Sequence, residues 1–421
     1  MSESPRRSFY KLIYYPAEKL EEVRQTGEAT DEWYRVTLYR LVDLARSVAS
    51  KYSRAKVREA LPEDFQYIID ELLHTSGEEH DKQAYYQNII GTVIEVGMAG
   101  AFIEALCRLI KRMAVDRLHV VGDIYDRGAR PDRILDMLME HHRVDIQWGN
   151  HDIVWMGAAA GSAVCVATVL NSALQYNTLA IVENTYGISL RDLIGFAQET
   201  YKGCTWFMPR SEDDAYYVKN RMDTLSKAHK AIAIIMFKLE GQLIRRHPEY
   251  GMDDRLLLEH IDYTAHTVTI DGQVYPLNDS HFPTVDPADP YRLSDGEASL
   301  MASLVGAFRR SPALRRHIEF LYTCGSLYRV CNGNLLFHGC IPLCADGSFD
   351  TVRTFDGQSL AGRAYMDFCD RTARAAFYDG GQNELDFMYY LWCGRQSPLF
   401  GRSRMTTFER YFVSDCSAWD E

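Results

Sequence analysis

The stretch from residue 118 to residue 157 constrains the fold of this chain more than any other part of the sequence. It contains two motifs, Gly-Asp-Ile-Tyr-Asp-Arg-Gly at 122–128 and Gly-Asn-His-Asp at 149–152. Each motif follows a short apolar run, 119–121 and 144–148 respectively. Short apolar runs that end in turn residues predict buried strands.

The segment between the two runs predicts a helix over residues 131–142. Pro131 suits the first helical position, and Ile134, Leu135 and Leu138 form an apolar stripe. A strand–helix–strand unit of this length is a right-handed parallel crossover. Polar residues that follow parallel strands gather at one edge of the sheet. We therefore expect both motifs to lie at the same edge.

The motif residues offer ligands for divalent metals. Asp123 follows a predicted strand, and its two carboxylate oxygens can bridge a pair of hard cations. Asn150 adds a neutral amide oxygen, which suits Mn, Mg, Fe or Zn in a mixed shell of oxygen and imidazole donors. Two metals ~4 Å apart would activate a water molecule and clamp the oxygens of an in-line phosphoryl displacement.

Three further residues fit the chemistry of phosphate esters. Arg127 carries the planar fork that holds a phosphate with two hydrogen bonds, so it is a candidate substrate-binding and catalytic residue. His151 can protonate the leaving alkoxide, and we expect Asp152 to fix its tautomer and raise its basicity.

A structural interpretation is available for each motif alone. Gly-Asp and Asp-Arg-Gly are typical of turns, and Asn-His-Asp is typical of a helix cap. The two motifs occur together, in this order and each after a predicted strand. That combination favours a metal-dependent phosphatase.

The composition limits the classes of protein that fit. The chain has 421 residues, of which 47% are hydrophobic and 25% charged, as in ordinary globular proteins. A net charge of −12 argues against general binding to nucleic acid or membranes. The ten cysteines form no C-x-x-C pair, and scattered thiols predict a reducing, cytoplasmic compartment. No signal peptide or membrane-spanning run is recognisable.

The rest of the chain predicts three regions. Residues 1–113 have helical stripes, for example Phe102, Leu106 and Met113. Residues 158–325 read as a mostly helical insertion with a β-hairpin near 266–277. Segments 114–157 and 326–421 would then form the core around the motifs.

A second hairpin is predicted where Asn332-Gly333 separates two apolar runs. Its second strand ends at His338. A histidine in this position is often a buried structural residue. Because a metal site is already indicated, we interpret His338 as an imidazole ligand.

The chain resembles class III fructose-1,6-bisphosphatase, a family of the metallophosphatase (calcineurin-like phosphoesterase) superfamily. The resemblance covers nearly the whole chain. Its most specific pieces include LHVVGDIYDRGARPDRI, VDIQWGNHDIVWMGA, GSLYRVCNGNLLFHGCIP and, at 397–412, SPLFGRSRMTTFERYF.

The resemblance implies an α/β (α+β) fold with a metallophosphatase-type αββα sandwich core and large helical insertions. It also implies hydrolysis of the 1-phosphate of fructose 1,6-bisphosphate in gluconeogenesis, with Mn²⁺. Asp123 would bridge the metals, with Asn150 and His338 as further ligands. His151, beside Asp152, would be the proton donor, and Arg127 would clamp the phosphate.

The chain also departs from the family pattern. The superfamily's first motif, Asp-x-His, would lie before residue 1, and the chain contains no Gly-His dipeptide for the last motif. Asp279-Ser280-His281 has the first spacing, but we interpret it as a coincidence in a polar loop. We therefore expect a core incomplete at both ends, with about half of the metal ligands and impaired hydrolysis.

Two other functions fit the same motifs. One is a metallophosphatase of another specificity, such as a protein phosphatase, because Asp-Arg-Gly and Gly-Asn-His-Asp are shared across the superfamily. The other is a non-catalytic remnant. The sequence leaves a homo-oligomer open.

Overall fold

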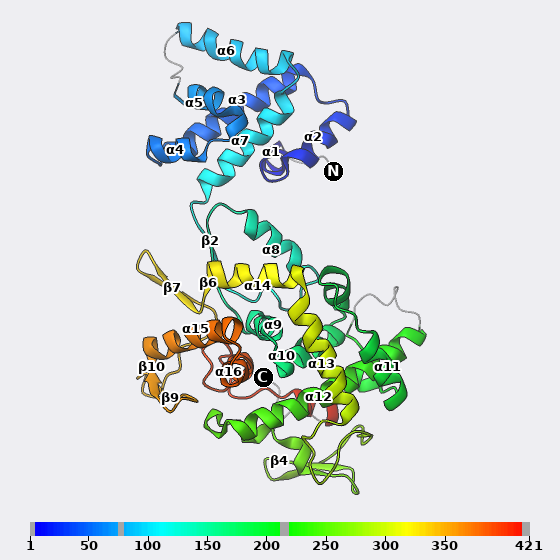
Figure 1. Ribbon diagram of the computed structural model, residues 1–421. Coiled ribbons are helices and arrows are strands. Elements are labelled where there is room, and N and C mark those ends of the chain that lie inside the picture. Colours follow the sequence, from blue (N-terminus) through cyan, green and yellow to red (C-terminus); the bar gives the residue numbers. More distant parts are fainter. Residues whose placement is uncertain (1–4, 75–79, 211–218, 415–421) are drawn as a thin grey trace. The chain divides into compact units, whose positions relative to one another are not determined.

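The computed structural model describes residues 5–74, 80–210 and 219–414, and the chain divides into two compact units, Met1–Leu118 and His119–Glu421 (Figure 1). The described part of the first unit is helical through Ala114. Its elements are α1 (Pro5–Tyr14), α2 (Pro16–Gln25), α3 (Asp31–Ala49), α4 (Arg54–Ala60), the 3-10 turn η1 (Glu63–Phe65), α5 (Gln66–His74), α6 (His80–Glu95) and α7 (Ala99–Ala114).

Helix α7 organises the first unit. It contacts α1, α2, α3, α4 and α6. The predicted stripe is confirmed, since Phe102, Leu106 and Met113 are all buried. Helix α3 begins after Thr30, whose hydroxyl accepts a hydrogen bond of 3.2 Å from the backbone N–H of Trp33. This cap satisfies one of the free N–H groups of the first turn.

The second unit mixes helices with small sheets. Its helices and helical turns are α8 (Pro131–Glu140), α9 (Asn150–Ala160), α10 (Ala163–Gln175), the π-helical turn η2 (Ile181–Thr185), α11 (Arg191–Thr200), η3 (Thr205–Phe207), α12 (Lys219–Arg246), η5 (Pro248–Tyr250), η6 (Asp253–Arg255), η7 (Leu257–His260), α13 (Asp295–Arg310), α14 (Pro312–Cys324), α15 (Gly362–Tyr378), α16 (Gln382–Cys393) and α17 (Thr407–Phe412). The strands are β1 (Leu118–Val120), β2 (Val144–Gln147), β3 (Ile261–Asp262), β4 (Thr267–Ile270), β5 (Gln273–Pro276), β6 (Gly325–Ser326), β7 (Tyr328–Cys331), β8 (Asn334–Phe337), β9 (Thr351–Arg353) and β10 (Ser359–Ala361).

The sheet that carries the two motifs has the strand order β1-β2-β6. Strand β6 pairs parallel to β2, with Ile146 opposite Gly325 and Gln147 opposite Ser326. The strand–helix–strand unit from β1 through α8 to β2 is therefore present, as predicted.

Both predicted hairpins are confirmed. β4 and β5 are joined by Asp271-Gly272, with φ of 51° and 79°, and β7 and β8 by Asn332-Gly333, with φ of 51° and 75°. Positive φ at both central residues is the backbone of a type I′ turn, which matches the twist of paired strands. The second hairpin delivers His338 directly after β8.

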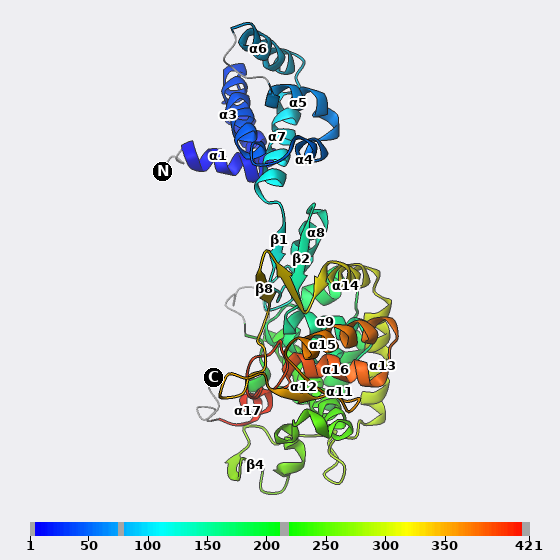
Figure 2. The same ribbon diagram turned by 90° about the vertical axis from the view of Figure 1, so that its left-hand side faces the viewer.

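Helix α9 forms the centre of the second unit and begins inside the second motif. It contacts α10, α13, α14, α15 and α16, and Figures 1 and 2 show it among these helices. Its side chains from Ile153 to Met156 are buried. A helix that is apolar all round belongs in a core, so packing fixes the position of α9 while Asn150 and His151 at its start face the cavity.

Three details differ from the predictions. The strand over 119–121 is half-buried rather than buried, and Val121 is 53% exposed, because β1 lies at the edge of a three-stranded sheet. Ile134 is exposed, so only Leu135 and Leu138 of the α8 stripe face the core. The run of small residues at 158–163 predicts a helix that continues to about Leu174, but α9 ends at Gly161, whose φ is 109°, and α10 begins at Ala163.

The observed fold class is mixed α and β, as expected. In the part of the chain that the structure describes, no single helix is both long and apolar enough to span a membrane, although the bent pair Ala84–Glu95 and Ala99–Ala114 meets those two criteria jointly. All nine described cysteines are free thiols.

Candidate metal and phosphate site

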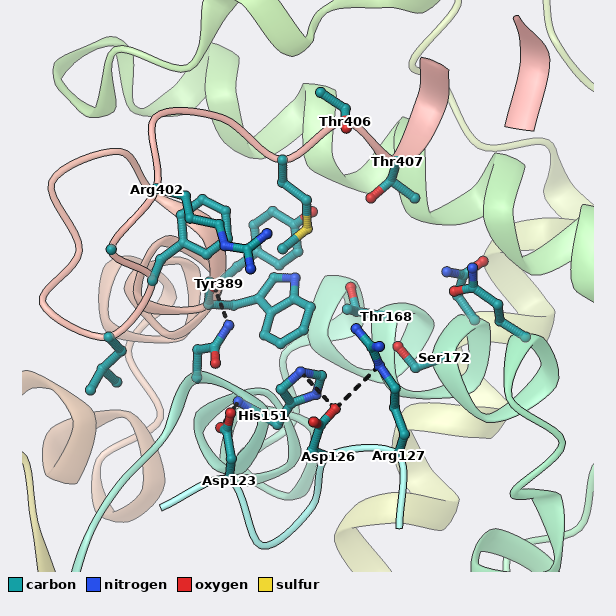
Figure 3. A pocket seen from close by; sticks show the side chains of 18 of the residues that line it. Asp123, Asp126, Arg127, His151, Thr168, Ser172, Tyr389, Arg402, Thr406 and Thr407 are labelled. Carbon is teal, nitrogen blue, oxygen red and sulfur yellow. Dashed lines mark hydrogen bonds and ion pairs between the residues drawn. The ribbon is translucent and has the colours of Figure 1, made fainter. Parts of the chain in front are cut away.

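A cavity of about 540 Å³ in the second unit is lined by residues of both motifs (Figure 3). Asp123, Arg127, Asn150, His151 and His338 all line it. The expectation that His338 approaches the motifs from far along the chain is confirmed, since its Nε2 lies 3.4 Å from Oδ2 of Asp123.

The backbone of the two motif loops passes in close contact. A side chain at Gly122 would overlap the backbone of Gly149, and a side chain at Gly149 would overlap the carboxylate of Asp123. Gly122 and Asp123 both have left-handed backbone, with φ of 83° and 53°. Glycine adopts this conformation freely, and aspartate is among the few other residues that tolerate it. The glycines therefore allow the loops to meet.

Asp152 ties these two loops together. Its carboxylate is fully buried and accepts hydrogen bonds from the N–H of Gly149 at 2.9 Å and of Tyr125 at 3.1 Å. Burial raises the pKa of Asp152 to about 6, although these two hydrogen bonds favour the charged form. We expected Asp152 to orient the ring of His151, but the structure differs because its carboxylate is occupied by backbone N–H groups of both loops.

Asp126 takes the place expected for Asp152. Its Oδ1 lies 3.1 Å from Nε2 of His151 and 3.5 Å from Nε of Arg127, and Figure 3 shows Asp126 between these two side chains. Asp126 was not predicted as a site residue, because Asp-Arg-Gly is common in turns. Its position three residues after Asp123 was the available signal.

His151 is held from several directions. Its backbone N–H donates to Oδ1 of Asp123 at 3.1 Å, and its ring packs edge-on against Trp392, with centroids 4.8 Å apart. Burial lowers the pKa of His151, whereas Asp126 and Asp123 act to raise it. A negative ligand near the ring would therefore favour its protonated form.

His338 has the orientation of a metal ligand. Its Nδ1 donates to the backbone carbonyl of Val121 at 2.7 Å, so its Nε2 faces Asp123. A backbone carbonyl on one imidazole nitrogen fixes the tautomer and leaves the other nitrogen to bind a metal. The hydrogen bond to Asp123 raises the pKa of His338. Burial would raise the pKa of Asp123, but the two histidines more than offset it and lower that pKa.

The side chain of Asn150 is oriented by a backbone carbonyl of α16. Its Nδ2 donates to the carbonyl of Trp392 at 3.3 Å, which leaves the amide oxygen to serve as a ligand. Asp123, Asp126 and His151 each offer a ligand atom, and these atoms lie within 4.8 Å of one another. Carboxylate oxygens and imidazole nitrogens suit a divalent first-row metal. The residues present therefore fit a metal at this end of the cavity.

Arg127 lies beside the metal-binding end. Its guanidinium packs over the ring of Tyr176, 4.7 Å from the centroid. Stacking on an aromatic ring and pairing with Asp126 limit the rotamers of this side chain. The fork is thus oriented before any phosphate arrives.

The side of the cavity opposite the two carboxylates has a different chemistry. Figure 3 shows Arg402, Thr406 and Thr407 across the cavity from Asp123 and Asp126. We group five lining residues under the name arginine wall. They are Arg255, Arg402, Thr406, Thr407 and Arg410.

The arginine wall was not predicted from the sequence. Four of its members lie within 397–412, a segment noted above only for its resemblance, and Arg255 lies in a separate 3-10 turn. No local pattern links these positions to the motifs.

The alternative Asp-x-His at 279–281 lies outside the lining of this cavity. Asp279 accepts a hydrogen bond of 2.6 Å from Nζ of the buried Lys230 and another of 2.8 Å from the N–H of His281. Its carboxylate therefore compensates a buried charge, which agrees with the interpretation of this motif as a coincidence.

The chain matches known proteins along its whole length. A family model described as Firmicute fructose-1,6-bisphosphatase matches residues 1–421. The chain is 50% identical over 411 residues to a class 3 fructose-1,6-bisphosphatase of Clostridium novyi, covering 96% of this chain and 62% of that protein. It is 48% identical over 421 residues to a class 3 fructose-1,6-bisphosphatase of Clostridium beijerinckii, covering 99% of this chain and 63% of the relative.

A relative from Listeria innocua, also named a class 3 fructose-1,6-bisphosphatase, is 48% identical over 415 residues, covering 97% of this chain and 63% of its own length. The chain thus spans less than two thirds of the length of these curated relatives. No solved structure matches the chain.

Proposed function

The chain belongs to the Firmicute fructose-1,6-bisphosphatase family, and on this premise we propose that it hydrolyses fructose 1,6-bisphosphate to fructose 6-phosphate and phosphate. The observation that carries the proposal is the convergence of Asp123, Asp126, His151 and His338 in one cavity that also contains arginines. Acidic and imidazole donors beside a guanidinium fork are the parts that phosphomonoester hydrolysis requires.

We assign the roles as follows. Asp123, Asn150 and His338 would hold divalent metal, with Mn²⁺ as our choice, and Asp126 is added to this set. When bound, the metal supplies Lewis acidity toward water and the phosphoryl oxygens. Asp152 acts as a positioning residue, because it joins the two loops that carry these side chains.

Arg127 and His151 act on the substrate itself. Arg127 would grip the transferred phosphoryl group with its fork. His151 would donate a proton to the leaving sugar oxygen. Burial lowers the pKa of His151, and the negative charge of the substrate phosphate would favour its protonated form.

We extend the proposal to the fold and the setting. In this proposal the β1-β2-β6 sheet and its covering helices would form part of a metallophosphatase-type αββα sandwich core. The free thiols are in keeping with a cytoplasmic enzyme of carbohydrate metabolism. The proposed fold and the proposed cytoplasmic setting are both compatible with a homo-oligomer.

The test is a phosphate-release assay on the 421-residue chain with and without Mn²⁺. The panel contains fructose 1,6-bisphosphate, a phosphopeptide and p-nitrophenyl phosphate. We expect metal-dependent release from the sugar bisphosphate that exceeds release from the other two esters. A preference for the phosphopeptide would assign the chain to protein phosphatases. No release with any ester would indicate a non-catalytic remnant.

A further inference from the structure

We propose that the arginine wall is the subsite for the phosphate that the reaction leaves in place, the 6-phosphate of the sugar bisphosphate. This inference rests on the proposed function, because it assigns the uncleaved end of the same substrate. The ligand chemistry is a phosphate monoester dianion attached to a small sugar.

The first observation is the state of Arg255. Its side chain is 8% exposed and lines the cavity. Nη2 pairs with Glu240 and lies 3.5 Å from the hydroxyl of Tyr389, but Nε and Nη1 are buried with no hydrogen-bond partner. Buried donors without an acceptor are costly. A phosphate in the cavity has acceptor oxygens of the kind that a guanidinium fork binds.

The second observation is independent and concerns Thr406. Its hydroxyl is buried and also has no hydrogen-bond partner, and the residue lines the same cavity. A hydroxyl can donate to a phosphate oxygen. Two separate side chains of one wall thus have unused donor capacity.

The third observation is the distribution of charge in the cavity. Among the described residues, the lining carboxylates are Asp123 and Asp126, both at the metal-binding end. Arg402 lies across the cavity from them, Arg410 lines the same cavity, and Arg255 interacts electrostatically with Glu409, the neighbour of Arg410 in α17. A phosphate monoester carries a charge of about −1.5 to −2 at neutral pH. The arginine wall therefore favours an anion without the help of a metal.

The size of the cavity favours a sugar bisphosphate over a phosphopeptide. A cavity of about 540 Å³ lies within the range of small-molecule sites. With a divalent metal held by the carboxylates, both ends of the cavity would attract phosphate, which matches a molecule with a phosphate at each end. A phosphopeptide with a single phosphate would leave one end without a partner.

The experiment measures binding of fructose 6-phosphate to the 421-residue chain by calorimetry, with a chelator present so that no metal contributes to binding. Inorganic phosphate is titrated in parallel. The variants are Arg402→Gln, Arg255→Lys, which keeps the charge beside Glu240, and Thr406→Val. The control is Arg363→Gln, whose side chain is 84% exposed and lies outside the cavity lining.

We expect Arg402→Gln and Arg255→Lys to weaken fructose 6-phosphate binding about 10- to 100-fold, and Thr406→Val about 3- to 10-fold. The control should change it by less than about 2-fold. Thr406→Val should leave the melting temperature unchanged or higher, because it removes an unsatisfied buried hydroxyl. A purely structural Thr406 would instead lower the melting temperature without weakening binding.

Two results would overturn the subsite: binding by all three variants that equals the control, or a wild-type chain that binds inorganic phosphate as tightly as fructose 6-phosphate. The proposed function is judged separately by the hydrolysis assay. Hydrolysis by the chain, together with unchanged fructose 6-phosphate binding in the variants, would contradict the subsite and leave the proposed function standing. Weakened binding without any hydrolysis would remove the proposed reaction alone.

Discussion

The two units of the chain bury different kinds of side chain. Among the described residues, the buried polar or charged side chains of the first unit are Lys19 and Thr37. The second unit buries whole ion pairs, for example Lys238 with Glu297, whose side chains are both fully buried 2.7 Å apart. The first unit therefore resembles a plain helical core, and the second contains buried charges that need partners.

This difference shows where sequence alone is informative. An apolar stripe packs against any matching stripe, so its burial follows from local spacing. A buried charge is tolerated only beside its partner, and Lys238 lies 59 residues from Glu297 in the sequence. Buried pairs are weak evidence for stability. The buried ion pairs are concentrated in the second unit, which also contains the cavity and the two motifs.

The largest expected effect is on the chemistry of the second unit. His151→Ala should lower metal-dependent phosphate release about 10²- to 10⁴-fold, because it removes the proposed proton donor. Bound metal, measured by elemental analysis, should stay nearly constant. Loss of the metal would show instead that His151 is a ligand, as its place in the cluster with Asp123 and Asp126 also allows.

The next effect compares buried and exposed ion pairs directly. Lys238→Met leaves Glu297 buried without its cation and should cost about 3–5 kcal/mol in free energy of unfolding. Adding Glu297→Gln should recover much of this loss. Arg35→Gln breaks an exposed pair with Glu32 in the first unit and should cost less than about 1 kcal/mol. The free energies of unfolding are measured by denaturant titration. Equal losses for Lys238→Met and Arg35→Gln would contradict this difference between the two units.

A pH effect should appear in the second unit through His229. Its Nδ1 donates to the carbonyl of Phe207 at 2.9 Å and its Nε2 lies 3.1 Å from the hydroxyl of Tyr411. Burial lowers the pKa of His229 to about 4. Its contribution to stability is therefore complete above the unfolded pKa of about 6.5 and is lost as the pH falls toward 4, by about 3 kcal/mol at most.

The raised pKa of Asp152 has the opposite sign over an overlapping range, because its folded form takes up a proton more readily than the unfolded chain. The measurement is therefore a difference between the wild type and His229→Asn, followed by denaturant unfolding from pH 4 to pH 7. The wild type should lose more stability than the variant as the pH falls. Parallel curves would contradict the role of His229.

The smallest effect tests the first unit. Thr30→Ala removes the cap of α3 and should cost about 1 kcal/mol, whereas Thr30→Ser, which keeps the hydroxyl, should cost little. Hydrogen exchange in the first turn of α3 gives a local measurement. A cost as large as that of Lys238→Met would mean that the first unit also depends on single polar contacts.

Local signals predicted much of the fold. The stripe of α7 and the two hairpin turns depend on residues close in sequence, and they appeared where expected. Ile134 was misplaced because an apolar residue beside a stripe can face either way. The break at Gly161 was missed because a run of small residues suits a continuous helix until one adopts positive φ.

The site could be predicted only in part for the same reason. Asp123, Asn150, His151 and His338 follow strands or hairpins, so their convergence could be inferred. Asp126 was hidden in a turn motif, although its carboxylate lies against the His151 ring. Arg255 and the segment 399–411 approach the cavity through tertiary packing, which no periodicity in the sequence indicates.

The close passage of the two motif loops sets limits on how this site could be re-engineered. Gly122 and Gly149 contribute no functional group, yet the space left by their missing side chains is the space that the backbone and the Asp123 carboxylate occupy. A mutant library aimed at new substrates should therefore hold both glycines constant. Diversity would be better introduced at Arg402, Thr406 and Thr407, on the opposite wall, where a changed side chain would meet the ligand before it meets the loops.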